Sequence, residues 1–292
     1  MSEVLMTPGL IGLTLLALVT WAVELRHYFR PVERTPSRLF GWLTVVLIGL
    51  LVLMRWLDAE GWQPLHSHLD GLLLIGLMLG ASQLYLRSKP RLGRIGLVIW
   101  PVLAFLLAWA LCASAWTYRP FKLDSLEHVW RVVHLGGVYA GTLFAVLAAI
   151  FGGLYLFVYR AVKRHDLASP QPGLPSLEWT ESAVIRFTTL GFVTLTIGLI
   201  SGVVVVADTP GRLGSEWWLS PKVVLATASW LAFALAMNVR TLSLFRGPRA
   251  AWLAITGLVL LLGVHGLVTS WPDPKPVEET VVPVEQSREA RP

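Results

Sequence analysis

Residues 131–159 read RVVHLGGVYAGTLFAVLAAIFGGLYLFVY, an apolar run interrupted near its start by His134. A helix needs about 20 mostly apolar residues to cross the hydrocarbon core of a bilayer, and this run is longer. Seven other stretches reach or approach that length: 9–25, 39–57, 70–86, 95–116, 184–207, 221–239 and 250–270. The sequence therefore predicts an all-α fold, a polytopic transmembrane helix bundle of about eight spans.

The composition supports the same class. Of the 292 residues, 55% are hydrophobic and 14% are charged, whereas soluble domains carry roughly 25% charged residues. Fourteen tryptophans fit a membrane protein, because indole favours the interface between lipid and water. The lipid bilayer is thus an expected partner. Nucleic acid is not, since the net charge of +6 is spread over short loops.

Net positive charge is concentrated in alternate loops, because the basic residues of the intervening loops are balanced by Asp and Glu. The positively charged loops follow the first, third, fifth and seventh apolar runs, in residues 26–38, 87–94, 160–164 and 240–249. By the positive-inside rule these loops are cytoplasmic. Both termini, and the loop 208–220, are then predicted on the outer face.

Two histidines are predicted at similar depth near that face, on different helices. They are His134 and His265. Two neutral imidazoles so placed could be the axial ligands of one haem iron. Glycines near each histidine would let a planar ring or another helix come close. The alternative is that each histidine bonds a backbone carbonyl or a neighbouring helix.

A short polar loop with adjacent tryptophans lies between the sixth and seventh runs. It spans Gly211 to Lys222 and includes Trp217 and Trp218. The two indoles could form a flat wall against a porphyrin, or they could be interfacial anchors. Its Ser-Pro-Lys ending is typical of a helix start.

The pair His66 and His68 lies in the first outer loop, near acidic residues. It could bind a divalent metal weakly, but it lacks the spacing of strong zinc motifs, and a solvated loop is the favoured interpretation. A small-solute or metal transporter using this loop is a further, weaker hypothesis. No P-loop, nucleophile elbow or HExxH motif occurs, so we expect no enzymatic activity of its own.

The region from about 68 to 270 resembles the cytochrome c assembly (CcsA/CcmC/HemX-like) integral membrane proteins, most closely the bacterial HemX- and YpjD-like branch. The resemblance rests on segments in the family's order and spacing: 133–140 around His134, 172–178, 190–202, 229–240, 246–257 and the position of His265. The family's outer loop has the form WGxxWxWDPKE. Here Gly214, Trp217, Pro221 and Lys222 match, while Leu213, Leu219, Ser220 and Val223 replace the first and third tryptophans, the aspartate and the glutamate.

The resemblance implies a domain organisation. Residues 1–67 would hold two N-terminal transmembrane helices with their loops. Residues 68–270 would form a six-helix cytochrome c assembly-like domain. Residues 271–292, rich in proline, glutamate and valine, would be a disordered tail on the outer face.

The resemblance also implies a function. The protein would be a multi-pass protein of the bacterial cytoplasmic (inner) membrane, an accessory of cytochrome c-type biogenesis that binds or presents haem at the outer face. Its partners would be cytochrome c maturation or other membrane assembly components. With one cysteine it has no thiol pair, so thioether attachment would need a partner. The altered tryptophan loop leaves an alternative open, a non-haem membrane scaffold or assembly factor.

Overall fold

The computed structural model describes residues 2–29, 37–58, 65, 67–89, 92, 95–116, 125–164, 175–208, 217–238 and 247–270. These residues form eight α-helices: α1 (Ser2–Phe29), α2 (Ser37–Asp58), α3 (His68–Arg87), α4 (Gly96–Trp116), α5 (Ser125–Lys163), α6 (Leu177–Asp208), α7 (Pro221–Met237) and α8 (Pro248–Ser270). A short 3₁₀ turn, η2 (Trp217–Leu219), comes before α7. The described part of the chain contains no strand, so the predicted all-α class is confirmed.

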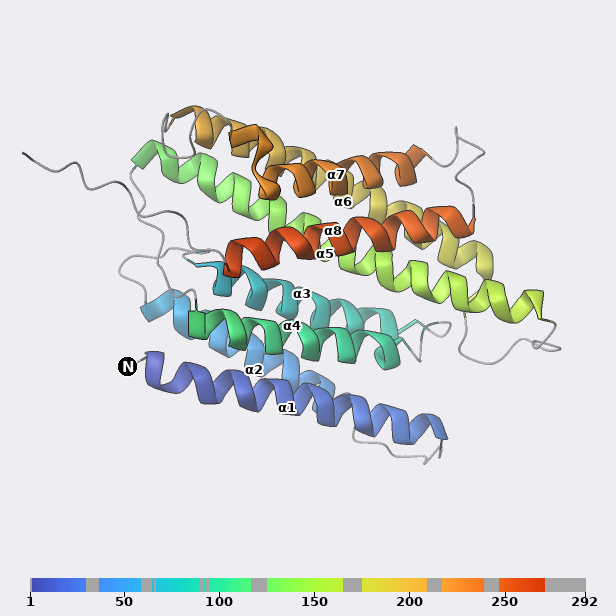
Figure 1. The fold of residues 1–292 in the computed structure, drawn as a ribbon. Coiled ribbons are helices and arrows are strands. Elements are labelled where there is room, and N and C mark those ends of the chain that lie inside the picture. Colours follow the sequence, from blue (N-terminus) through green and yellow to red (C-terminus); the bar gives the residue numbers. More distant parts are fainter. Residues whose placement is uncertain are drawn as a thin grey trace, which may run out of the picture.

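The helices lie side by side as one bundle (Figure 1). Seven of the described helices are long and apolar enough to cross a membrane, and α7 is a shorter apolar helix of 17 residues. Each of the eight predicted runs overlaps one of the eight helices, which confirms the polytopic bundle. The start of α1 and the end of α8 lie at the same end of the bundle (Figure 1). That this end faces outward stays a prediction.

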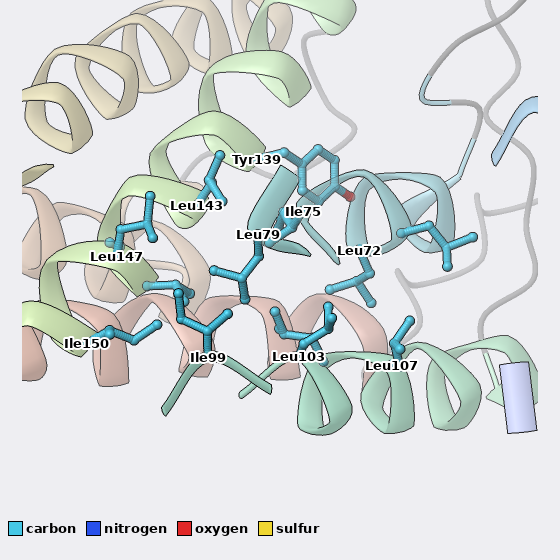
Figure 2. Packing of buried hydrophobic residues seen from close by; sticks show 14 of the residues in the cluster. Leu72, Ile75, Leu79, Ile99, Leu103, Leu107, Tyr139, Leu143, Leu147 and Ile150 are labelled. Carbon is cyan, nitrogen blue, oxygen red and sulfur yellow. The ribbon is translucent and has the colours of Figure 1, made fainter. Parts of the chain in front are cut away.

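Helix α5 lies at the centre of the packing. Its buried leucines and isoleucines meet those of α3 and α4 in the core that Figure 2 shows. On another side α5 meets α6 through glycines: a Cβ added at Gly137 would lie 2.8 Å from the backbone nitrogen of Gly198. Small residues allow this approach, and membrane helices gain packing contacts from it. A cavity beside α5 therefore has walls from several helices.

Buried ion pairs join α3 to the two N-terminal helices. Arg55 of α2 lies 2.5 Å from Asp70 of α3, and Glu24 of α1 pairs with Arg87 at the far end of α3. Asp70 and Ser67 also form the capping box that begins α3. Charges within membrane helices are costly unless paired, so these pairs hold α1 and α2 against α3.

Candidate functional site

A cavity of about 300 Å³ lies among α3, α5, α6, α7, α8 and η2. Most of its lining is valine and leucine. The polar and aromatic side chains on its wall are His68, His134, Tyr139, Trp217, Lys222 and His265. The two histidines that the sequence predicted as a pair therefore do line one cavity, which belongs to the end of the bundle where α3, α5 and α7 begin.

His134 of α5 is held by α6. Its Nδ1 lies 2.7 Å from the carbonyl oxygen of Gly198. Gly202, one turn further along α6, leaves room for the ring, because a Cβ there would lie 2.9 Å from Nδ1 and Cε1 of His134. Two glycines of α6 thus determine the position of this imidazole.

His265 of α8 is buried, with 8% of its surface exposed. Its Nδ1 lies 3.1 Å from the carbonyl oxygen of Leu261 on the same helix. Its Nε2 lies 3.4 Å from Oγ1 of Thr142, whose hydroxyl donates to the Val138 carbonyl at 2.8 Å. The ring of Tyr139 packs edge-to-face against the His265 ring.

The two carbonyls decide where the ring protons lie. A carbonyl oxygen only accepts, so the Nδ1 atoms of His134 and His265 must be the donors. In a neutral imidazole, Nε2 then carries the lone pair. Metal-binding histidines in proteins are commonly oriented in this way, with the other ring nitrogen bonded to a carbonyl or carboxylate. Each histidine therefore does bond a backbone carbonyl, as the alternative interpretation expected. The same bond leaves the Nε2 lone pair available to bind a metal.

The side chains of the adjacent tryptophans lie in different surroundings. Trp217 lines the cavity, whereas Trp218 is 56% exposed and is not among the lining residues. Ser220 caps α7: its side chain accepts from the backbone nitrogen of Val223. Lys222, in the first turn of α7, brings a positive charge to the cavity wall.

His68 is a cavity residue that the sequence interpretation assigned to a solvated loop. It is the first residue of α3, and its Nδ1 lies 3.0 Å from the Tyr139 hydroxyl. The capping box of Ser67 and Asp70 was the signal for a helix start here. His66 lies outside the described residues. Within the described residues, no group of three or more His, Cys, Asp or Glu side chains could hold a metal ion.

Fold and site together define a class: a multi-pass helical membrane protein with a histidine-lined apolar cavity at one end of its bundle. A sequence model of the family described as Cytochrome C assembly protein matches residues 65–272, and the chain belongs to this family. The match includes α3 to α8 and every lining residue of the cavity.

Curated relatives carry the name cytochrome c biogenesis protein CcsA. The protein from Guillardia theta is 25% identical over 246 residues, covering 77% of this chain and 80% of its own length. Those from Porphyra purpurea and Prochlorococcus marinus (strain MIT 9301) are 26% and 24% identical, covering 77% and 86% of this chain and 82% and 88% of their own length. No solved structure matches. The finer resemblance to the HemX- and YpjD-like branch stays a prediction.

Proposed function

We propose that this protein handles haem in cytochrome c biogenesis, as an integral membrane accessory that binds haem in the cavity and presents it at the outer face. The bacterial cytoplasmic membrane is the proposed location. The family membership, and relatives named for cytochrome c biogenesis, support the pathway. The observation that carries the haem assignment is the pair of imidazoles from α5 and α8 on one apolar cavity, each with Nδ1 at a backbone carbonyl.

The residues present fit a haem. The valine and leucine lining suits an apolar macrocycle, and His134 and His265 would hold its iron through their Nε2 atoms. Trp217 would pack against the ring, with Trp218 as a second, more exposed part of the platform. Lys222 would pair with a propionate carboxylate. A bound haem would supply a redox-active iron centre.

The protein's own contribution is then binding, orientation and exclusion of water. Gly198 and Leu261 hold the two imidazoles in the required tautomer, and the apolar walls limit solvent access, which influences the redox potential of a bound iron. Because the chain has one cysteine, attachment of haem to an apocytochrome would be carried out with a partner. We propose that the role of this chain is to present haem to such a partner.

The test is a visible spectrum of the purified protein after haem supplementation. We expect a low-spin haem band that is lost in the double variant His134→Ala/His265→Ala and weakened in each single variant. His27→Ala is the matched control, because His27 lies in the last turn of α1, at the other end of the bundle.

Two outcomes would contradict the proposal: no haem band in the supplemented wild type, or a band unchanged in the double variant. Co-purification of membrane assembly components without iron would instead support the scaffold alternative. The changed tryptophan loop, with Trp218 away from the cavity lining, is the observation that favours that alternative.

A further inference from the structure

Tyr139 lies between two histidines of the cavity. It is buried, with 4% of its surface exposed. Its hydroxyl lies 3.0 Å from Nδ1 of His68 on α3. Its ring centroid lies 5.9 Å from that of His265 on α8, with the ring planes at 79°. One side chain of α5 thus contacts a histidine on each of two other helices.

A glycine of α3 provides the space for the Tyr139 ring. A Cβ added at Gly71 would lie 2.0 to 2.3 Å from three carbons of that ring, a distance no side chain can adopt. Figure 2 shows the ring lying against α3. The ring therefore has a fixed position against a helix backbone.

The Tyr139 hydroxyl is fixed as well. A buried tyrosine hydroxyl needs a hydrogen-bond partner, and α3 supplies two acceptors or partners, Nδ1 of His68 at 3.0 Å and the His68 carbonyl at 3.5 Å. His68 is itself held at the first position of α3 by the capping box. Ring and hydroxyl together make Tyr139 a rigid surface for its other neighbour, His265.

The Tyr139 ring contacts the His265 ring from α5. The bond from Nδ1 of His265 to the Leu261 carbonyl directs one ring nitrogen, and the 3.4 Å contact of Nε2 with Thr142 is long for a hydrogen bond. We propose that Tyr139, held by His68, is a positioning residue that fixes the plane of the His265 imidazole. The consequence for haem rests on the proposed function, in which His265 is a haem ligand. The contact of Tyr139 with His265 is present without haem, so it can be tested in haem-free protein.

The first test therefore uses haem-free protein with ¹⁵N-labelled histidine in detergent micelles. The His265 signals are assigned by their loss in His265→Ala. We expect Tyr139→Leu to shift or broaden them strongly, Tyr139→Phe to shift them less, and Tyr155→Phe to leave them unchanged. Tyr155 is a buried tyrosine of the same helix that packs against Tyr159, away from the cavity. Unchanged His265 signals in Tyr139→Leu would overturn the proposal.

A double-variant cycle tests the role of His68. If His68 acts through Tyr139, His68→Ala shifts the His265 signals in the wild-type background and adds nothing in Tyr139→Phe. His68→Gln, which can still bond the hydroxyl, should restore most of the wild-type signal and guards against a folding defect. An equal effect of His68→Ala in both backgrounds would show that His68 acts independently and would overturn its assigned role.

A second readout applies to haem-loaded protein. The electron paramagnetic resonance of a low-spin ferric haem with two imidazoles depends on the orientation of their planes, so Tyr139→Leu should change its g-values while Tyr155→Phe should not. Absence of haem binding by the wild type would refute the proposed function and leave the histidine resonances to decide this inference. Haem binding with unchanged g-values and resonances would refute the inference alone.

Discussion

His134 and His265 are held in different ways although they line the same cavity. His134 is partly exposed, and its position depends on a second helix: it bonds the Gly198 carbonyl and lies over Gly202, both on α6. His265 is buried and bonds the Leu261 carbonyl of its own helix, with Thr142 and Tyr139 of α5 beside it. The position of His134 therefore depends on how α5 packs on α6, whereas that of His265 is set largely within α8 and by α5.

The largest effect is expected from Gly137→Ala. A Cβ here would lie 2.8 to 2.9 Å from backbone atoms of Gly198 and Thr194, which cannot move without separating α5 from α6. Overpacking of this kind costs about 1–3 kcal/mol. We expect a lower unfolding temperature by scanning fluorimetry and weakened haem binding through the displaced His134.

The matched control is the neighbouring Gly136→Ala. Nothing lies within 4 Å of a Cβ at Gly136, so this variant should be neutral or stabilising by up to about 1 kcal/mol through helix propensity. Equal destabilisation by both variants would show that the α5–α6 glycine contact is not what the packing depends on.

Gly202→Ala should disturb His134 directly, at the wall of the cavity. The added methyl would lie 2.9 Å from the imidazole and displace it from the Gly198 carbonyl, a hydrogen bond worth about 0.5–1.5 kcal/mol. Haem titration should show up to about tenfold weaker binding. Gly191→Ala, also on α6 but with only ordinary contacts, should leave the affinity unchanged. An unchanged affinity in Gly202→Ala would contradict the conclusion that α6 holds His134 in place.

Ser220→Ala should destabilise the start of α7, the helix that carries Lys222. It should leave the positions of both histidines unchanged. Loss of an N-cap side chain costs about 1 kcal/mol. Ser220→Asp, the residue that the family motif has here, should retain the stability because aspartate caps as well as serine. Thermal unfolding of the two variants separates these outcomes, and equal losses in both would argue against the capping role.

Thr142→Val should have the smallest effect. It removes a hydroxyl 3.4 Å from Nε2 of His265, a contact longer than a normal hydrogen bond, and the Leu261 carbonyl still holds the ring. We expect a change in haem affinity at or below about threefold, near 0.5 kcal/mol. A loss as large as that of Gly202→Ala would mean that the Thr142 hydroxyl holds His265 as strongly as α6 holds His134.

The bundle could be predicted from the sequence because bilayer thickness sets a minimum length for an apolar run. The shared position of His134 and His265 followed from their depth in two such runs. The sequence could not predict that Trp217 lines the cavity while Trp218 is exposed, since this difference depends on η2. A 3₁₀ turn has three residues per turn, so consecutive side chains point about 120° apart, and only Trp217 reaches the cavity.

The role of His68 was missed for another reason. The spacing of His66 and His68 was compared with zinc motifs, whereas the informative pattern was Ser67 with Asp70, a capping box that starts α3 at His68. The sequence could not predict that the Tyr139 ring lies against Gly71 and the His134 ring against Gly202. Which ring lies against each glycine is decided by the register between helices.

The two ion pairs of α3 have a consequence for how the protein is made. Glu24 and Arg55 belong to α1 and α2, and their partners Arg87 and Asp70 both belong to α3. A chain synthesised from its N-terminus therefore presents the first two helices to the membrane before the α3 partners of Glu24 and Arg55 have been made. Both ion pairs form when the third helix arrives, so we expect α1, α2 and α3 to become stable in the membrane together and not as a helical hairpin followed by α3.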